Sequence, residues 1–211
     1  MKRTIILTII ISFLSIRGYS QQETKSFLFG AGVGFGFFYP TDINNMLYDR
    51  YGMGSGDDIV DMVIYFVLNV NGSYFLSKHS ELQLDAEWAF SPKMIKTSSD
   101  IHSYFYQRFT PALKYNFHIP LGKKTSIYIG AGINWSFLKF NSESGNDMKG
   151  NCIGFSGQAG LMWKFSKWAI KPFITANFIN ANNTDALGED PVPEDFDLNF
   201  TGVQVGNIFY F

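Results

Sequence analysis

The stretch ELQLDAEWAFS, residues 81–91, alternates between polar and apolar side chains, with Ala89 as the one exception. The first set is polar and mostly charged, and the second is apolar and includes a tryptophan: Glu81, Gln83, Asp85 and Glu87, against Leu82, Leu84, Ala86, Trp88 and Phe90. A period of two is that of a β-strand, in which successive side chains point to opposite faces. The stretch therefore predicts a strand with one charged face and one apolar face.

The same alternation recurs in seven other segments: residues 27–39, 62–76, 104–117, 126–140, 153–165, 168–179 and 200–211. The connections between them alternate in length, with long ones at 40–60, 92–103, 141–152 and 180–197 and short ones at 77–80, 118–124 and 166–167. All long connections then lie at one end, as in an up-and-down barrel whose chain ends lie on the short-turn side. We therefore expect an all-β fold, an eight-stranded antiparallel up-and-down transmembrane β-barrel.

Two orientations of the side chains are open for such a barrel. A soluble, lipocalin-like ligand-binding barrel would enclose the apolar faces, whereas a membrane barrel would turn them toward lipid. The apolar faces here carry many large residues, and the opposite faces are rich in Gly, Ser, Thr and Asn, which fit a narrow interior. The polar faces also carry both signs of charge on neighbouring strands, so that enclosed charges would find partners. These observations favour a membrane barrel with a filled polar interior.

The four tryptophans provide a second indication of orientation. If the first strand runs away from the short-turn side, Trp88 and Trp135 lie near the long-loop end of the barrel, and Trp163 and Trp168 lie near the short-turn end. Tryptophan is enriched at both interfaces of a membrane-spanning barrel. The sequence therefore predicts two aromatic belts.

The composition excludes several classes of protein. Hydrophobic residues make up 46% of the 211 residues, aromatic residues 18% and charged residues 17%, which argues against a disordered chain. The single cysteine excludes an intramolecular disulfide and a multi-cysteine metal site. A net charge of -1 argues against a generally basic nucleic-acid binder, so we expect no nucleic-acid partner.

The N-terminal residues have the pattern of a secretory signal peptide. Lys2 and Arg3 precede an apolar stretch, and small residues stand at the −3 and −1 positions before Gln21. Arg17 makes the apolar run too short for a membrane-spanning helix. We expect residues 1–20 to be the signal peptide and residues 21–211 to form the outer-membrane β-barrel domain.

The last strand, GVQVGNIFYF at residues 202–211, ends on an aromatic residue and carries Phe209, Val205 and Val203 on the same face. It resembles the C-terminal β-signal that the barrel-assembly machinery of Gram-negative bacteria recognises, although Asn207 departs from the apolar pattern. The chain from residue 21 onward resembles the small outer-membrane β-barrel superfamily, which includes the OmpA-transmembrane/OmpX type and the PorT-like "outer membrane protein beta-barrel domain". The resemblance implies integration in the cell outer membrane, contact with its lipid and lipopolysaccharide, and recognition of Phe211 by the assembly machinery.

Two prolines interrupt the predicted strands. Pro111 and Pro172 each remove a donor from the hydrogen-bond ladder, and a closed barrel has no free edge to accommodate them. We therefore predict bulges or local loosening at both positions.

Two motifs suggest small ligands at first sight. The glycines between Gly30 and Gly36 have a strict period of two, unlike the strand–turn–helix of a nucleotide loop, so we expect interior packing or strand curvature. Two long connections are acidic, with Asp42, Asp49, Asp57 and Asp58 in the first and Asp185, Glu189, Asp190, Glu194, Asp195 and Asp197 in the last. They could hold a divalent cation that bridges to lipopolysaccharide, but they have no EF-hand-like spacing, and a solvated acidic surface is the prediction.

Asp100, His102 and Ser103 lie together near the long-loop rim, where an enzyme acting on lipid or peptide could place its site. Cys152, at the base of the third long connection, is expected to be a quiet small residue, with a disulfide-linked dimer as the alternative. We assign no catalytic, cofactor-binding or metal-ligating residue and expect no cofactor. The predicted function is that of a non-enzymatic integral outer-membrane protein. It acts structurally or through its long outer loops, by adhesion or by contact with an unknown protein partner such as a secretion assembly.

Overall fold

The computed structural model describes residues 27–38, 63–96, 101–142, 147–181, 185–187, 198–199 and 201–211. Eight long strands form the wall: β1 (Phe27–Phe38), β2 (Val63–Ser77), β3 (Ser80–Lys96), β4 (Ile101–Pro120), β5 (Thr125–Ser142), β6 (Asp147–Lys164), β7 (Ala169–Phe178) and β11 (Gly202–Tyr210). Three short strands lie near one end: β8 (Asn180–Ala181), β9 (Asp185–Leu187) and β10 (Leu198–Asn199). In this part of the chain no helix has the length and apolar character needed to cross a membrane.

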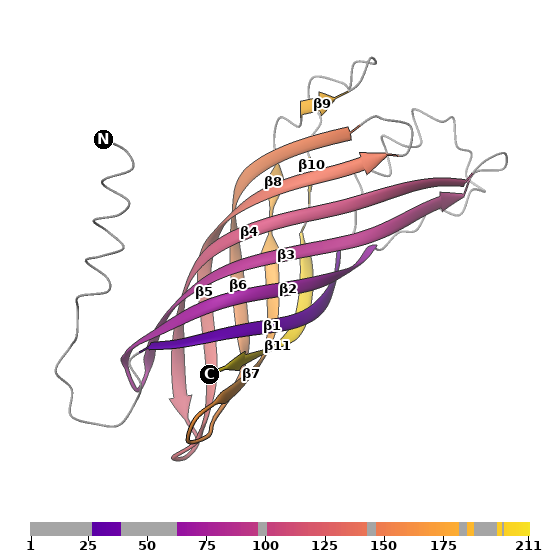
Figure 1. The fold of residues 1–211 in the computed structure, drawn as a ribbon. Coiled ribbons are helices and arrows are strands. Elements are labelled where there is room, and N and C mark those ends of the chain that lie inside the picture. Colours follow the sequence, from indigo (N-terminus) through magenta and orange to yellow (C-terminus); the bar gives the residue numbers. More distant parts are fainter. Residues whose placement is uncertain are drawn as a thin grey trace.

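The eight long strands close into an antiparallel barrel. Consecutive strands pair with one another, β1 also pairs with β11, and the pairing of β5 with β6 completes the circle (Figure 1). Pairing traced round the barrel from Phe27 returns to β1 at Phe37, a shear of ten residues, by way of Tyr74, Leu82, Tyr115, Ala131, Gly157, Ala176 and Val203. This stagger tilts the strands by about 40° and leaves an interior that side chains can fill.

The short connections gather at one end of the barrel, which we call the turn end. They join β2 to β3, β4 to β5 and β6 to β7, and the C-terminus lies beside them (Figure 1). Backbone bonds link the ends of the wall here: the Phe211 N–H donates to the Phe29 carbonyl at 2.9 Å, and the Lys164 N–H to the Lys124 carbonyl at 2.7 Å. The opposite end, the loop end, leads into segments outside the described residues.

Two of the predicted long connections are wrong in length. Residues 92–103 and 141–152 were expected to be loops, but β3 and β4 remain paired as far as Lys96 and Ile101, and β5 and β6 as far as Phe140 and Met148. The ladder continues past the apolar band because backbone pairing does not require apolar side chains. The alternation of apolar residues therefore indicates the extent of the apolar band and underestimates the length of the strands.

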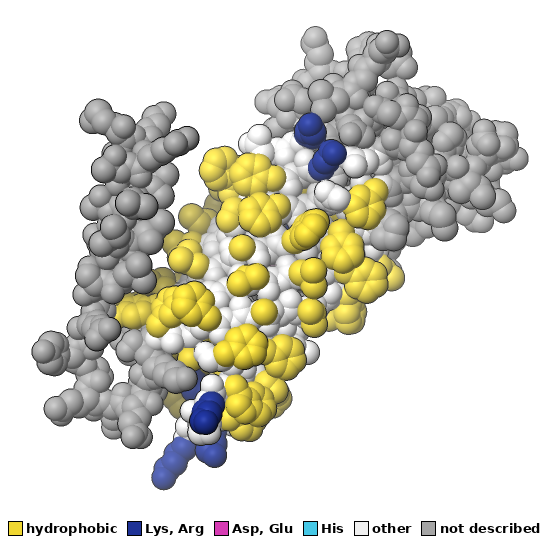
Figure 2. Space-filling model, in the orientation of Figure 1, with side chains coloured by type: hydrophobic (Ala, Val, Ile, Leu, Met, Phe, Trp, Pro, Cys, Tyr) yellow, Lys and Arg dark blue, Asp and Glu magenta, His cyan; other side chains and the backbone are white. Residues whose placement is uncertain are grey.

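The wall is apolar on the outside and polar on the inside, as predicted. Trp88 is 51% exposed and Phe155 64%, whereas Glu87 is 7% and Arg108 1% exposed. Figure 2 shows hydrophobic side chains across the visible wall, with Lys and Arg side chains beyond both ends of this band. A soluble barrel that encloses its apolar faces is inconsistent with this arrangement.

The tryptophans lie at two levels, as predicted. Trp163 and Trp168 flank the turn between β6 and β7, and Trp163 pairs with Thr125. Trp135 lies ten residues further along the same strand as Thr125. At about 3.3 Å per residue and a tilt of about 40°, this separates the two levels by about 25 Å, the height of an outer-membrane apolar band.

Interior glycines accommodate large neighbours on the adjacent strand. Eight interior glycines each pair with a residue whose side chain leans over them: Gly30 with Asn71, Gly32 with Asn69, Gly36 with Tyr65, Gly130 with Asn116, Gly132 with Lys114, Gly154 with Asn134, Gly160 with Tyr128 and Gly206 with Phe173. A Cβ on any of these glycines would come within 3.0 Å of that side chain. The period-two glycines of β1 therefore provide space in a narrow interior, as expected.

Both prolines loosen the wall without shifting its register. The β4–β5 ladder is interrupted beside Pro111, between the pairs Phe109–Phe137 and Ala112–Asn134. The β6–β7 ladder is interrupted in the same way beside Pro172, between Gly160–Phe173 and Trp163–Ile170. The register is the same on either side of each gap, so the prediction of local loosening is confirmed and that of bulges is wrong. Proline lacks the backbone N–H and so removes one hydrogen bond from the ladder, but it inserts no extra residue, and the register is kept.

Candidate functional site

The turn end of the interior is organised around Glu81, which is fully buried at the start of β3. Lys171 Nζ of β7 donates to both carboxylate oxygens at 2.8 Å. His118 Nε2 lies 2.6 Å from Oε2, and Ser73 Oγ donates to Oε1 at 2.5 Å. Asn116 Nδ2 adds a fourth donor at 3.1 Å. We call these five residues the turn-end cluster; together they compensate the cost of burying a carboxylate.

Three residues at this end stand in the order found in serine hydrolases. Glu81 contacts His118 Nε2, and His118 Nδ1 lies 3.0 Å from Ser126 Oγ. All three side chains are buried inside the barrel, and the Glu81 carboxylate already faces the ammonium group of Lys171. A nucleophile must reach its substrate. The arrangement is therefore that of a structural hydrogen-bond chain.

A polar ladder extends from this cluster toward the middle of the barrel. Lys171 also donates to Gln83 Oε1 at 2.6 Å, and Gln83 donates to Asp85 at 2.7 Å. Asp85 forms an ion pair with Lys114 at 2.6 Å. Gln158 of β6 joins the ladder by donating to Asn116 at 2.5 Å. Side chains from β3, β4, β6 and β7 thus connect opposite walls and fill the lower interior.

A second ion pair lies nearer the loop end. Arg108 of β4 pairs with Glu87 of β3, and both are buried. Gln204 of β11 donates to the other Glu87 oxygen at 2.7 Å, and the Arg108 guanidinium lies 5.2 Å from the centre of the Tyr65 ring. We call these four residues the loop-end cluster. The Phe38 ring packs above it, 5.9 Å from Tyr65.

Polar side chains beside the loop-end cluster are incompletely bonded, since Asn69 pairs with Glu87 and Thr175 with Gln204. Buried side-chain atoms of several residues find no hydrogen-bond partner within the described part of the chain, among them atoms of Asn69, Asn134, Ser156, Thr175 and Asn177. Four of these residues are neighbours on one stretch of wall. Ser156 pairs with Asn177, Thr175 lies two positions before Asn177 on β7, and Asn134 pairs with Gly154, two positions before Ser156. Buried amides and hydroxyls are normally satisfied, so this layer is suited to ordered water.

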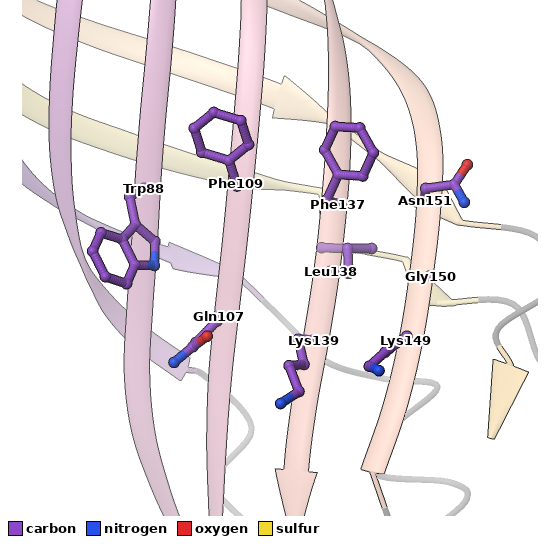
Figure 3. Close-up of a pocket in the computed structure, with 9 residues that line it drawn as sticks. All are labelled: Trp88, Gln107, Phe109, Phe137, Leu138, Lys139, Lys149, Gly150 and Asn151. Carbon is purple, nitrogen blue, oxygen red and sulfur yellow. The ribbon is translucent and has the colours of Figure 1, made fainter. Parts of the chain in front are cut away.

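The outside of the barrel carries a groove of about 380 Å³ near the loop end, over β3 to β6. We call it the wall groove (Figure 3). It is lined by Trp88, Gln107, Phe109, Phe137, Leu138, Lys139, Lys149, Gly150 and Asn151. Two rows of paired residues make up its outward face. One row is Trp88, Phe109, Phe137 and Asn151, and the next toward the loop end is Gln107, Lys139 and Lys149.

The structure describes only some of the candidate residues that the sequence analysis named. His102 and Ser103 are consecutive on β4, paired with Ile95 and Met94, but Asp100 and these two side chains lie outside the described residues. The first acidic connection is also outside them, as is the last from residue 188 to 197, and Asp185 is placed only as backbone in β9. Cys152 is a free, half-buried cysteine on β6. In the ranges that the structure describes, no group of three His, Cys, Asp or Glu side chains is arranged for a metal ion.

The sequence matches no protein-family model and no curated protein. The structure, in contrast, is similar to solved barrels. The crystal structure of Neisserial surface protein A superposes with a TM-score of 0.60 at 9% identity, over 90% of this chain and 98% of that one. The fold is that of the small outer-membrane β-barrels.

Two further solved structures are more distant. Ail, the attachment invasion locus protein of Yersinia pestis, was solved in complex with the heparin analogue sucrose octasulfate. It has a TM-score of 0.46 at 12% identity, over 88% of this chain and 99% of that one. The outer membrane protease OmpT from Escherichia coli has a TM-score of 0.41 at 9% identity, over 89% and 97%. At these identities the likeness concerns the fold.

Proposed function

We propose that this protein is a non-enzymatic integral outer-membrane barrel that acts at its loop end. The observation that carries the proposal is the inverted polarity of the wall. Large apolar side chains such as Trp135, Ile129 and Phe155 are exposed, while Glu81, Arg108 and Lys171 are buried. A soluble monomer rarely exposes more than a few hundred Å² of contiguous apolar surface. A band of this kind round a closed barrel is suited to the hydrocarbon core of a membrane.

A filled interior supports a structural role over that of a general pore. Eight strands leave room for side chains and no wide channel. Both clusters span the interior, and Phe38 packs on Tyr65 of the loop-end cluster. With the interior occupied, the part of the molecule available for partners is the loop end. Adhesion or contact with a membrane-assembled partner would take place there.

The buried Ser126–His118–Glu81 chain supports a non-enzymatic role. Its carboxylate is shared with Lys171, and its serine lies within the wall. The rim alternative, with Asp100, His102 and Ser103, would require a hydrolase or acyltransferase activity toward lipid or peptide that is lost in His102→Ala. A reproducible activity with this dependence would contradict the proposal.

Membrane extraction tests the integral location. We expect the expressed chain to stay with the membrane in high salt and in alkaline carbonate, and to be extracted only by detergent. The extracted barrel is expected to run faster on electrophoresis unheated than boiled, because a folded barrel resists the detergent. Release by salt without detergent would contradict the membrane assignment.

The C-terminal aromatic residue tests the proposed assembly route. Phe211 is exposed beside β1 and lies at the end of the last strand. We expect Phe211→Ala to lower the amount of folded barrel in cells severalfold, because the assembly machinery would recognise this residue. Phe165→Ala removes another exposed aromatic residue at the turn end and is the matched control. Equal loss in both variants would indicate lost lipid contact and contradict specific recognition.

A further inference from the structure

Asn207 places an exposed carboxamide on the outward face of β11. Its neighbour Ile208 and the next alternate residue, Tyr210, are buried inside the barrel, so Asn207 points to the outside of the wall. The other outward positions of β1, β7 and β11 hold apolar residues. The β-signal that this strand resembles is apolar here, so recognition by the assembly machinery does not explain the amide.

The register places Asn207 near the middle of the apolar band. Asn207 pairs with Pro172 of β7, and Ile170, two residues before Pro172, pairs with Trp163 at the turn-end level. The path from β6 through β7 to β11 rises toward the loop end, in the same direction as the shear that leads from Phe27 to Phe37. Two residues along a strand and two steps between strands, at a tilt of about 40°, raise Asn207 about 11 Å above Trp163. The band is about 25 Å high, so the amide lies deep in the hydrocarbon.

The surroundings of Asn207 offer no polar partner. A carboxamide has two N–H donors and one acceptor oxygen. Within the described ranges its side chain forms no hydrogen bond, and its four nearest outward neighbours are Val33, Pro172, Val205 and Phe209. Neither water nor an acyl chain can bond the amide at this depth, and an unbonded polar group in hydrocarbon is costly. Another membrane-embedded protein surface would remove that cost.

The shape of this face permits close contact. Val33, Pro172 and Val205 have short side chains and surround Asn207 on three sides, and Phe209 lies on the fourth. Short residues let protein surfaces in a membrane approach one another, so that a polar side chain can form a hydrogen bond between them. The ladder between β6 and β7 is also interrupted beside Pro172. We call the outward residues Val33, Pro172, Val205, Asn207 and Phe209 the amide face.

We propose that two copies of this chain pair in the membrane through the amide face. A carboxamide both donates and accepts, so Asn207 is complementary to Asn207 of a second copy. Copies inserted in the same orientation are related by a two-fold axis along the membrane normal, which sets equal levels of the two walls against each other. A lipid acyl chain has no polar group to offer. The inference rests on the proposed function, because the amide is costly only where hydrocarbon surrounds the barrel.

The oligomeric state of the refolded barrel tests the pairing. Sedimentation equilibrium in a density-matched non-ionic detergent, at several ratios of protein to detergent, measures the dimer dissociation constant. We expect Asn207→Leu to weaken the dimer about tenfold, since it removes the hydrogen bonds between the copies and keeps an apolar wall. Asn207→Gln keeps the carboxamide and is expected to stay within about threefold of the unaltered protein. A barrel that is monomeric at every ratio would overturn the proposal, as would a dimer that Asn207→Leu leaves equally tight.

A second variant blocks the contact while the amide remains. Val33→Trp places a large side chain beside Asn207, and we expect it to weaken the dimer at least tenfold, because the copies could no longer approach closely. Leu113→Trp is the matched control, since Leu113 is exposed on β4, on the opposite side of the barrel. We expect this control to leave the dissociation constant unchanged. Equal weakening in the two tryptophan variants would contradict a contact through the amide face.

Cross-linking locates the contact in vesicles. Cys152→Ser removes the single cysteine of the chain, and Val205→Cys or Leu113→Cys then introduces one thiol on either side of the barrel. We expect a short bismaleimide to link two copies through position 205 and to leave the variant at position 113 monomeric. Cross-links at position 113 with none at position 205 would overturn the proposal, as would cross-links of position 205 to a different protein in native membranes with none between copies.

Failure of the dimer is distinguishable from failure of the proposed function. If the unheated barrel does not migrate as a folded species or does not insert into vesicles, the proposed function fails. If it folds and inserts but remains monomeric in detergent and without cross-links in vesicles, only the dimer fails.

Discussion

The two ends of the barrel interior differ in how completely their charges are paired. At the turn end Glu81 receives bonds from Lys171, His118, Ser73 and Asn116, and backbone bonds tie the neighbouring turns together. Toward the loop end Glu87 is held by Arg108 and Gln204 alone among the described residues. Nearby, both amide atoms of Asn134 and the Nδ2 of Asn177 find no hydrogen-bond partner among the described residues. The turn end thus has redundant contacts, while the loop end depends on single ones.

The number of donors around each buried carboxylate predicts which buried cation contributes more to the free energy of unfolding. We expect Arg108→Met to give the largest loss, about 3–5 kcal/mol in the free energy of unfolding, because Glu87 would keep only Gln204 as a donor. Urea unfolding of the barrel in lipid vesicles, followed by tryptophan fluorescence, measures it. A loss below about 1 kcal/mol would show that water replaces the guanidinium, and it would contradict the claim that the loop end depends on single contacts.

Lys171→Met is expected to cost less, about 2 kcal/mol. Glu81 would keep Ser73, Asn116 and His118 as hydrogen-bond partners. The same unfolding measurement applies. Adding His118→Ala to this variant should raise the loss toward that of Arg108→Met. If the loss of stability in Lys171→Met alone already exceeds that in Arg108→Met, the turn end has the less redundant contacts of the two ends.

A pair of glycines gives the smallest and most closely matched test. At Gly130 and at Gly32 alike, an added Cβ would meet an asparagine side chain and would lie 2.6 Å from a backbone carbonyl oxygen. Gly130→Ala would displace Asn116, which bonds Glu81 and Gln83, and we expect a loss of about 2 kcal/mol. Gly32→Ala would displace Asn69, whose Oδ1 has no partner among the described residues, and we expect a loss of less than about 1 kcal/mol.

Gly157→Ala is the control for the glycine pair, because nothing lies within 4 Å of the added Cβ and no loss is expected. Equal losses in Gly130→Ala and Gly32→Ala would mean that the backbone carbonyl decides the cost, and that the asparagine network contributes little.

Much of the barrel could be predicted because its signals are local. The alternation around Trp88 gives the strand and its two faces, and the mixture of Glu87 with Arg108 on the polar faces indicates enclosed pairs. Strand ends were less predictable. Lys149 fell in a predicted loop, yet it pairs with Lys139, since the ladder continues beyond the apolar band. The wall groove was therefore missed, and the only signal was Lys139 following Phe137 on the outward face.

Sequence alone determined the strand period, the number of long strands, and the choice of a polar interior over an apolar one. These follow from which residue types alternate, and alternation is a property of neighbours along the chain. Only the tertiary structure decided which polar groups meet. Glu81 and Lys171 are 90 positions apart, and closure of the barrel with a shear of ten residues brings them together. The register of β5 and β6 likewise places Lys139 opposite Lys149 at the wall groove. Partners across a barrel depend on register, and register is set by all eight strands at once.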